Sequence, residues 1–560
     1  MKLSRRDALK LGLATGGAWL GTAQSAEAAT KCPPQRHHGS PLDSPIPETD
    51  FHSPWIEPFQ RRFQTPPELR PVRSDERGDR PTDYYEITLQ KAQVNILADR
   101  PTEVWSYNGV VPGPTIRQRG GIEPEDQGRQ SVVRFINQIG QDDEGQDFKT
   151  VTHLHGMASL PQYDGYAEDL IPPDHFKDYI YPNDRAATIW YHDHAVEQTS
   201  RNVYKGLAGM YIVEDEYERR LNLPAGDYDV PLILQDVRLD ENGKLLFNDR
   251  ARRSLYGDIT LVNGVPWPYM PVERRKYRFR VLNASVSRAY QLVLSLDSQR
   301  QTLGETLSMI ATDAGLLGAP VPLTPTRRSP FKTLRIFPAE RYEFVIDFSA
   351  YEPDTSVYLR SPALDTNIDS SGRSQVLMRF DVMAGSPNDS SDLPQVLRPV
   401  ESILERAERE GRPVRTRTFR FGRSSTQWLI NNKVWNPYRV DANPEPGDIE
   451  IWELTNVGSG WTHPVHIHLV DWQIIDRNGI QPPEHERGWK DVFAIHEFET
   501  VRVAAQFGTR NGDYIKGKFM MHCHNLVHED HDMMTQFEVG QGGPSPCSEP
   551  ALPISEMRPL

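Results

Sequence analysis

The chain has 560 residues, of which 37% are hydrophobic, and this length is enough for roughly three or four domains with their own cores. Its formal charge of −14 argues against nucleic acid and anionic membranes as partners, so substrates should be neutral, cationic or admitted through a local basic patch. The 46 prolines favour many short strands joined by turns over long helices.

Residues 1–28 are interpreted as an export signal. Ser4 to Lys10 reads SRRDALK, which is similar to a twin-arginine motif, and an apolar run from Leu11 to Ala23 follows. Ala26-Glu27-Ala28 is an A-x-A cleavage site that would leave a mature chain beginning near Ala29. No later segment reaches the ~18–20 apolar residues that span a membrane. We therefore expect export by the twin-arginine machinery to the bacterial periplasm or the extracellular space.

The chain has three cysteines. Cys523 lies in a histidine-rich motif, Cys32 lies just after the signal, and Cys547 lies in the C-terminal tail. An oxidising compartment permits a disulfide between the last two, which would tie the ends of the chain together. Two free, exposed thiols are the alternative, and the sequence leaves both open.

The body of the chain is expected to be all-β. From Tyr84 onward, short runs of strand-forming residues alternate with Gly and Pro, as in a sandwich or barrel. Strands are predicted in a first block at Tyr85–Leu89, Val104–Tyr107, Ser131–Ile136, Ala187–His192 and Gly209–Val213. A second block of the same texture contains predicted strands at Tyr277–Leu282, Leu334–Phe337, Arg341–Phe348 and Gln375–Val382.

Three β domains are the simplest organisation of this pattern. We place them at residues 84–220, 221–384 and 415–540. An irregular lead-in, 29–83, precedes them, and a Gly/Ser/Pro-rich tail, 541–560, follows. The polar stretch 385–414 reads as a linker with a short charged helix within Glu401–Glu410.

Ten of the 17 histidines fall into four clusters, two in the first block and two in the third; His531, near the end of the last cluster, is counted with the seven scattered ones. Both imidazoles of an H-x-H pair on a strand face the same way, as two ligands of one metal site must. A single pair is usually a surface or hydrogen-bonded feature, but four clusters confined to two blocks indicate metal. The middle block has no such cluster. The centre should therefore form where the first and third blocks meet, with the second as a spacer or as part of the substrate entrance.

The last cluster, residues 522–534, reads HCHNLVHEDHDMM. A His/Cys/His set with a distant, weak Met is the ligand chemistry of an electron-transferring blue copper site. If Met520 to His524 is a strand, His522 and His524 point one way and Cys523 the other. One strand could thus serve two metal sites.

The four clusters in this order resemble those of the three-domain multicopper oxidases, over roughly residues 84–540. The bilirubin oxidase and spore-coat laccase branch is the most similar, on WTHPVHIHLVD at 461–471, HCHNLVHEDHDMM at 522–534, DGYAED at 164–169, YNG at 107–109, PGPTI at 112–116 and VNGVPWP at 262–268. The resemblance implies three cupredoxin-like Greek-key β-sandwich or barrel domains.

The resemblance also implies four copper ions, one of type 1, one of type 2 and two of type 3. The type 1 ligands would be His463, Cys523 and His528, with Met533 as the weak axial ligand; the family spacing favours Met533 over its neighbour Met534. The type 2 ligands would be His153 and His466. The type 3 pair would be held by His155, His192, His194, His468, His522 and His524.

Such an enzyme would couple one-electron oxidation of a small organic donor to four-electron reduction of dioxygen to water. Bilirubin-like tetrapyrroles, phenols and aromatic amines are the expected donors. An oxidase of cuprous or ferrous ions is the alternative, although the 12 methionines form no Met-rich insert. A non-catalytic structural protein on the same fold should have lost ligands, and none is lost.

Three further residues are assigned by the resemblance. Asp164 and Glu529 match acidic positions of a proton relay, although Asp164 also suits a plain Asp-Gly turn and Glu529 a solvated surface. Trp461 faces the same way as His463 and would line the donor approach, or simply pack in the core. Asp193, between two ligands on a strand, should face away from the metals.

Overall fold

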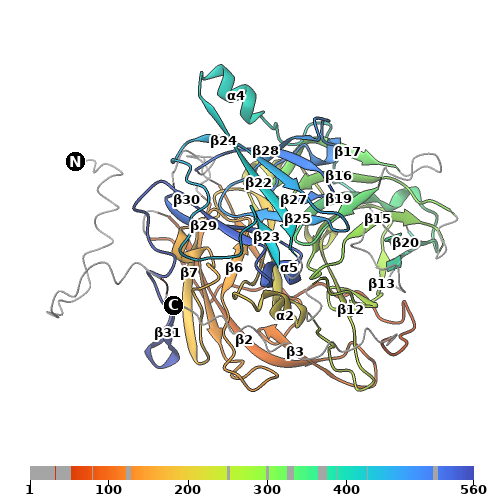
Figure 1. Cartoon of the computed structure of the whole chain (residues 1–560). Helices are drawn as coiled ribbons and strands as arrows, with labels where there is room; N and C mark the ends of the chain where they lie inside the picture. The colour runs from red at the N-terminus through yellow and green to blue at the C-terminus, as the bar shows by residue number, and fades with distance from the viewer. Residues whose placement is uncertain are drawn as a thin grey trace.

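The computed structural model describes residue 32 and residues 52–77, 80–121, 128–248, 253–297, 302–324, 333–362, 375–385, 388–424, 427–508 and 515–560 (Figure 1). The predicted signal, residues 1–28, lies outside these ranges. Across them, the model contains no helix with the length and apolar character that a bilayer crossing needs.

The described strands form six sheets, which make three two-layer units along the chain. In the first unit, one sheet has the order β1-β2-β5-β7-β31 with β3 on β2, and the other has the order β4-β9-β8-β6. Their strands are β1 (Arg73–Asp75), β2 (Thr82–Val94), β3 (Thr102–Tyr107), β4 (Gly113–Arg119), β5 (Gln130–Asn137), β6 (Thr152–His155), β7 (His175–Tyr181), β8 (Ala187–Asp193), β9 (Ala208–Glu214) and β31 (Leu552–Pro553). Alternate residues of β2, such as Tyr85, Ile87 and Leu89, are buried between the two layers, as a half-exposed strand requires.

The second unit pairs a sheet of order β12-β11-β10-β14-β19-β16-β17 with one of order β13-β21-β20-β15-β18. The strands are β10 (Asp229–Val237), β11 (Ile259–Val262), β12 (Val265–Pro266), β13 (Tyr269–Val272), β14 (Lys276–Asn283), β15 (Tyr290–Ser295), β16 (Leu307–Thr312), β17 (Gly315–Leu323), β18 (Leu334–Ile336), β19 (Arg341–Asp347), β20 (Ser356–Arg360) and β21 (Val376–Val382). Its core is the largest apolar cluster of the described chain and includes Phe279, Phe344 and Phe380.

The third unit pairs a sheet of order β23-β22-β24-β28-β26 with one of order β27-β25-β29-β30. The strands are β22 (Val414–Arg423), β23 (Trp428–Ile430), β24 (Ile449–Asn456), β25 (His463–Ile467), β26 (Gln473–Arg477), β27 (Val492–Ile495), β28 (Thr500–Gln506), β29 (Gly517–Cys523) and β30 (Met534–Val539). Its core contains Cys523 and Met533 beside Trp452 and Phe493, so part of the predicted blue copper site lies in the apolar interior.

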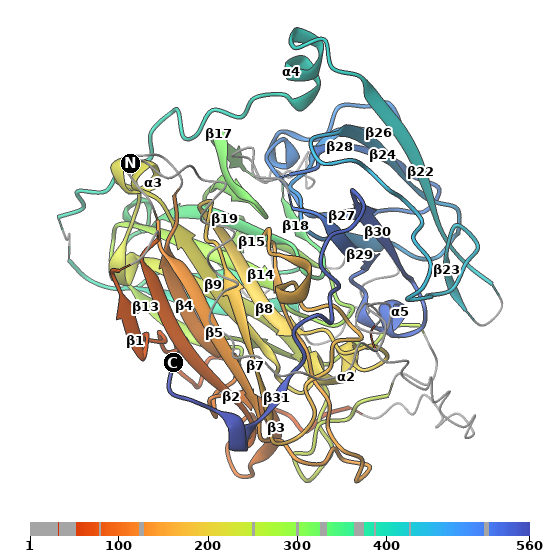
Figure 2. The same cartoon turned by 90° about the vertical axis from the view of Figure 1, so that its left-hand side faces the viewer.

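Helices are few and short in the described chain. They are α2 (Thr199–Tyr204), α3 (Glu216–Arg220), α4 (Ile403–Arg409) and α5 (Leu526–Asp530), with 3₁₀ turns η2 (Pro161–Tyr163), η3 (Gly226–Tyr228), η4 (Phe348–Ala350), η6 (Glu484–Glu486) and η7 (Ile554–Glu556). The helix predicted within 401–410 is thus observed as α4, which projects from the body in both views (Figures 1 and 2). The Ser402 side chain accepts from the backbone N–H of Glu405 and caps it.

The predicted all-β character is confirmed, but both ends of the chain are more ordered than expected. The lead-in is not irregular throughout, since β1 pairs with β2 and the N–H groups of Phe59 and Phe63 donate to Trp267 and Tyr269 carbonyls. At the other end of the chain, the C-terminal tail adds β31 to the edge of the first sheet, beside β7. β1 has three residues and β31 has two, too few to show an apolar alternation, so only their tertiary pairing defines them. The exact domain boundaries stay predictions.

The C-terminal tail leaves the third unit and returns along the first (Figure 2). Cys32 and Cys547 form a disulfide, which answers the question left open by the sequence. The hydroxyl of Tyr163 donates to the Glu549 carboxylate at 2.8 Å, and Arg134 Nη1 donates to the Arg558 carbonyl at 2.6 Å. The tail therefore fastens the third unit to the first.

Replacing Cys547 with serine should lower the free energy of unfolding by about 2–4 kcal/mol, because the open chain regains the conformational freedom that the cross-link removes. Denaturant unfolding followed by tryptophan fluorescence measures the change. Wild-type protein in a thiol reductant is the matched control and should unfold at the midpoint of the variant. A wild-type midpoint that does not move on reduction would contradict the stabilising role.

Candidate metal centre

The histidine motifs lie on the facing inner sheets of the first and third units. In the first unit, His153 of β6 is opposite His192 of β8. In the third unit, His466 of β25 is opposite His522 of β29, and Val465 is opposite Cys523. Each H-x-H pair therefore presents both rings to the same space between the units, as the strand geometry predicted.

Eight histidines converge in this space, and we call them the eight-histidine cluster. Their nitrogens form three groups, within each of which the ligand atoms lie within 4.8 Å of one another. The groups are His153, His155 and His466; His155, His192 and His524; and His194, His468 and His522. The two histidines that the sequence assigned to type 2 and the six assigned to type 3 are thus brought together.

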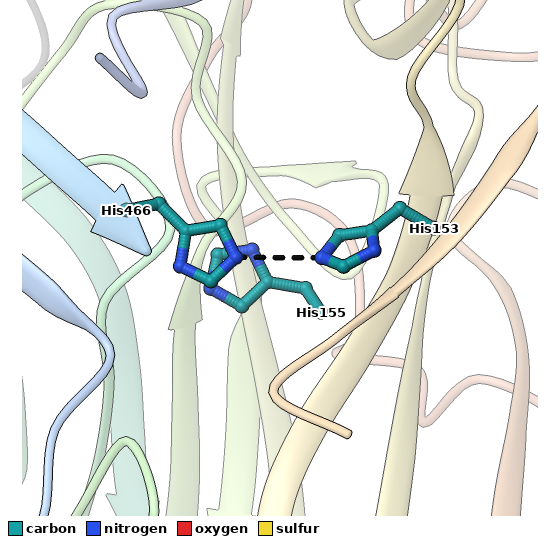
Figure 3. A group of neighbouring side chains, drawn as sticks. All are labelled: His153, His155 and His466. Atoms are coloured by element: carbon teal, nitrogen blue, oxygen red, sulfur yellow. Dashed lines mark hydrogen bonds between the residues drawn. The ribbon is translucent and has the colours of Figure 1, made fainter. Parts of the chain in front are cut away.

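The close-up of the first group shows rings from opposite units side by side (Figure 3). His153 and His466 point their Nε2 atoms at each other, 3.3 Å apart. The ring of His155 stacks on that of His466 with centroids 3.5 Å apart and planes 14° apart. Two nitrogens at such a distance are held without repulsion when a cation lies between their lone pairs.

In three of these rings, Nδ1 points away from the cluster and donates a hydrogen bond, which leaves Nε2 free. The Nδ1 atom of His466 donates to the carbonyl of Asp491 at 2.9 Å, and that of His192 donates to the Asp193 carbonyl at 2.7 Å. His153 Nδ1 likewise donates to the Asp164 carbonyl. Each ring then turns an unprotonated Nε2 toward the cluster, as a metal-ligating imidazole does.

Several ring nitrogens are buried and have no hydrogen-bond partner among the described residues. They include Nδ1 of His155, Nε2 of His192 and both nitrogens of His524. Burying such groups unpaired costs free energy unless an ion takes them. Burial also lowers the pKa of these imidazoles well below the usual value, so they are neutral and able to bind a cation. The cluster therefore fits metal ions.

A second, sulfur-containing site lies on the other face of β29. Cys523 Sγ is 3.5 Å from His463 Nδ1 and 3.6 Å from His528 Nδ1, and the two nitrogens are 3.2 Å apart. Ligands about 2.0–2.3 Å from one ion in a trigonal plane would be separated by roughly these distances. Burial raises the pKa of the Cys523 thiol and lowers that of His463 to about 3, so the thiolate form depends on a bound cation.

Met533 lies next to this site and Met534 does not. The Met533 carbonyl accepts from the Cys523 N–H at 3.0 Å, and both side chains belong to the third unit's core. Met534 instead pairs with His522 across β29 and β30 and packs with Tyr166 and Trp435. The position of a weak axial thioether thus fits Met533.

The two predicted relay carboxylates are both buried at the eight-histidine cluster. Asp164 Oδ2 accepts from His468 Nδ1 at 2.7 Å, and Glu529 Oε2 lies 2.8 Å from His522 Nδ1. Burial raises the pKa of Asp164 to about 6. For Glu529, burial also raises the pKa, but the imidazoles of His522 and His194 outweigh it and hold the value near 2. Glu529 is therefore not the solvated surface residue that the sequence allowed.

Asp193 points away from the eight-histidine cluster, whereas Trp461 lies beside the sulfur site. The carboxylate of Asp193 accepts from Thr150 Oγ1 at 2.5 Å and from Asn202 Nδ2 at 2.9 Å, away from the cluster. Trp461 is half-buried, with its ring 5.5 Å from that of His528. An aromatic side chain thus lies beside the sulfur site and also packs on the core, and its role in the donor approach stays a prediction.

Two residues of these sites gave no signal in the sequence. Trp428 stacks on His528 with centroids 3.7 Å apart and touches Trp461 edge to face at 5.3 Å. Asp491 accepts hydrogen bonds from two predicted ligands, through its carbonyl from His466 and through Oδ1 from His155 Nε2 at 3.0 Å. Trp and Asp are frequent elsewhere in the chain, so only the folded contacts identify these two.

Comparison with known proteins places the chain in a family. Family models described as multicopper oxidase match residues 88–218 and 410–543. The chain is 38% identical to a bilirubin oxidase of Albifimbria verrucaria over 81% of its own length and 76% of that protein. It is 33% identical to a laccase of Bacillus subtilis, covering 86% of its length and 99% of the relative.

A solved structure agrees with these relatives. The laccase of Pediococcus acidilactici superimposes with a TM-score of 0.73 at 28% identity, covering 88% of this chain and 95% of that one. The chain belongs to the multicopper oxidases, and the predicted cupredoxin-like fold is confirmed. It is a copper-binding oxidoreductase that uses oxygen as the electron acceptor.

Proposed function

We propose that this enzyme holds four copper ions and oxidises an anionic aromatic donor, such as a bilirubin-like tetrapyrrole, one electron at a time. Copper supplies the one-electron chemistry at the sulfur site and the storage of electrons for dioxygen at the histidine cluster. His463, Cys523, His528 and Met533 would hold the type 1 ion. Of the eight-histidine cluster, His153 and His466 would hold the type 2 ion, and the two groups His155, His192, His524 and His194, His468, His522 would each hold one type 3 ion.

The two sites are joined by covalent bonds of one strand. Cys523 follows His522 and precedes His524, and the alternation of β29 turns its side chain to the opposite face. This arrangement supports a direct electron path from the sulfur site to the cluster. Carboxylates within the cluster, Asp164 and Glu529, would hold and deliver the protons that oxygen reduction consumes.

The side chains beside His528 carry the proposal for the donor. Arg423 lies over Trp428 at 4.8 Å from the ring centroid, and Trp428 stacks on His528. Arg423 is also close enough to Arg253 for their charges to interact, and burial followed by that repulsion lowers the pKa of Arg423. Among the described residues, neither guanidinium forms an ion pair with a carboxylate.

An anionic ring system would complement this group of residues. Trp428 and Trp461 offer aromatic faces for stacking, while Arg423 and Arg253 supply positive charge that no described carboxylate pairs with, in a chain with a formal charge of −14. Bilirubin carries two carboxylates on an extended π system, so it meets both features. A cuprous or ferrous ion would instead be repelled by the two guanidiniums.

Replacing Arg423 and Arg253 together with glutamine should lower kcat/KM for bilirubin by about tenfold, because partly exposed charge pairs contribute up to about 1 kcal/mol each. A neutral phenol should lose less than about twofold. Steady-state oxygen uptake at several salt concentrations measures both effects, since only the charged donor should respond to salt.

Arg220→Gln is the matched control, because this guanidinium is exposed on α3 with only a local ion pair to Glu216. Its bilirubin kinetics should equal those of the wild type. Equal losses for bilirubin and phenol in the double variant would contradict recognition of an anion. Faster wild-type turnover of cuprous ion than of either organic donor would favour the metal-ion alternative.

The compartment is also proposed. The twin-arginine segment and the disulfide between Cys32 and Cys547 together support export to an oxidising space, the periplasm or the extracellular medium.

A further inference from the structure

Arg341, at the start of β19 in the middle unit, is fully buried and uses all five of its N–H donors. Its guanidinium binds the Asp491 carboxylate in a bidentate pair, at 2.7 Å to Oδ1 and 2.5 Å to Oδ2. The remaining donors reach the carbonyls of Thr188, Ala339 and Asp313 at 3.2, 3.1 and 3.0 Å. Lysine has neither the planar fork nor five donors, so only arginine satisfies this pocket.

Asp491 connects this guanidinium with two rings of the eight-histidine cluster. Its Oδ1 accepts from His155 Nε2 at 3.0 Å while it also accepts from Arg341. Its backbone carbonyl accepts from His466 Nδ1 at 2.9 Å. The proton of each ring is therefore held on the nitrogen that faces Asp491, and the other nitrogen is left for the cluster. One residue fixes the tautomer of a histidine from the first unit and of one from the third.

The backbone of Asp491 is itself held by the middle unit. Asp313 Oδ2 is 3.3 Å from the N–H groups of both Asp491 and Val492, and it pairs with Lys490 Nζ at 2.8 Å. Lys490 also pairs with Glu340 at 3.0 Å. All of these charged side chains are buried, so their geometry is set by one another and not by solvent.

Gly156, the residue after His155, provides independent evidence that the Arg341–Asp491 ion pair occupies a fixed position. A Cβ atom built on Gly156 would lie 2.8 Å from Ile189 Cγ2, 2.9 Å from Arg341 Nη2 and 3.0 Å from Asp491 Oδ2, so the ion pair supplies two of its three nearest atoms. The residue also has a φ of +97°, which favours glycine. The backbone at Gly156 therefore leaves room for the Arg341–Asp491 ion pair to pack directly against it.

We propose that Arg341 is a positioning residue for the copper cluster, supplied by a unit that contributes no copper ligand. It orients Asp491 so that His155 and His466 present the correct nitrogens, and the middle unit is thereby part of the metal centre's support. The inference rests on the proposed copper ligands and adds a residue from outside their two units.

Arg341→Lys and Asp491→Asn test this role, with Arg280→Lys as the matched control. Arg280 is equally buried at the junction of the first and middle units and pairs with Asp229 at 2.7 Å, but it contacts no ring of the cluster. Copper affinity is followed by metal analysis after dialysis against graded chelator, together with the blue absorption of the Cys523 site. Thermal unfolding of the copper-free proteins reports their folding.

Both test variants should hold the cluster copper 10–100-fold more weakly, about the loss seen when an outer partner of a ligand is removed, and keep the blue absorption. Arg280→Lys should change only the unfolding midpoint. Gly156→Ala, which crowds the same pair with Arg341 intact, should reproduce the loss even if Arg341→Lys folds poorly.

Wild-type copper affinity in Asp491→Asn and Gly156→Ala would overturn the inference. So would a parallel loss of blue and cluster copper that Arg280→Lys shares, because that pattern reports destabilisation alone. Wild-type protein that takes up no copper would instead contradict the proposed function itself.

Discussion

Cys523→Ser is expected to abolish the blue absorption and to reduce oxidation of organic donors to background. A serine hydroxyl does not form the soft, polarisable anion that a thiolate offers to copper. It is close in size to the thiol and sits at a fully buried position of β29, so the fold should persist. Visible absorption and steady-state oxygen uptake measure the two effects.

Metal analysis makes this variant more informative. The eight-histidine cluster keeps every ring, including His522 and His524 on either side of the substitution. Cys523→Ser should therefore lose one copper ion per chain and retain the others. Loss of all copper would show that the two sites are not separable, contrary to their positions on opposite faces of β29.

Met521→Leu serves as the control for local packing. Met521 lies two residues earlier on β29, is fully buried in the same core cluster as Cys523, and forms no hydrogen bond with His463 or His528. A volume-conserving change there costs less than about 1.5 kcal/mol. Its blue absorption should equal that of the wild type, and a blue Cys523→Ser variant would disprove the sulfur site.

The type of metal site could be predicted from the sequence because particular residue types at short, fixed spacings indicate it. H-x-H pairs on strands such as β6 and β8 face one way by the geometry of the strand alone, and a cysteine between two histidines must face the other. These patterns do not depend on tertiary packing. The family resemblance then named each ligand.

The grouping of the ligands could not be predicted in the same way. His155 of β6 shares one group with His192 of β8 and with His524, which directly follows β29 in the third unit. Such sharing depends on how two sheets meet across the interface. No spacing within one motif contains that information.

The residues that support the metal sites could not be identified from the sequence, for a related reason. Arg341, Asp491 and Trp428 are ordinary residue types without a motif. Arg341 and Asp491 contact each other across 150 positions of the chain, and Trp428 contacts His528 across 100. The edge strands β1 and β31 were missed because strands of three and two residues are too short to show an apolar alternation. A sequence pattern reports only the local arrangement of residues. The supporting roles of these side chains and the pairing of the two edge strands depend instead on residues far away in the chain.

Asp164→Asn is expected to slow oxygen reduction by about 10²–10⁴-fold, the usual contribution of a placed proton donor or acceptor. Asp164 Oδ2 accepts from His468 Nδ1, while its Oδ1 is buried with no hydrogen-bond partner among the described residues. An asparagine oxygen can keep the bond to His468 and so the ring's tautomer. The amide cannot take up and release a proton, so only the proton transfer is removed.

Asp193→Asn separates this role from burial alone. Burial raises the pKa of Asp193 to about 6, as it does for Asp164, and both residues adjoin predicted ligands. Asp193 directs its carboxylate to Thr150 and Asn202, so its variant should lose about 1–3 kcal/mol of stability yet reduce oxygen within a few-fold of the wild-type rate. Equal slowing in the two variants would show that any buried charge near the cluster has the same effect.

Two half-reactions then locate the defect in Asp164→Asn. Mixing with donor under nitrogen should bleach the blue absorption at the wild-type rate, because the sulfur site and its tryptophans are untouched. Mixing the reduced protein with oxygen should show the slow step. The proposed routes for electrons and protons reach the cluster from different residues, Cys523 on one side and Asp164 on the other. A variant that slows both half-reactions would therefore contradict the proton relay and point to a distorted cluster.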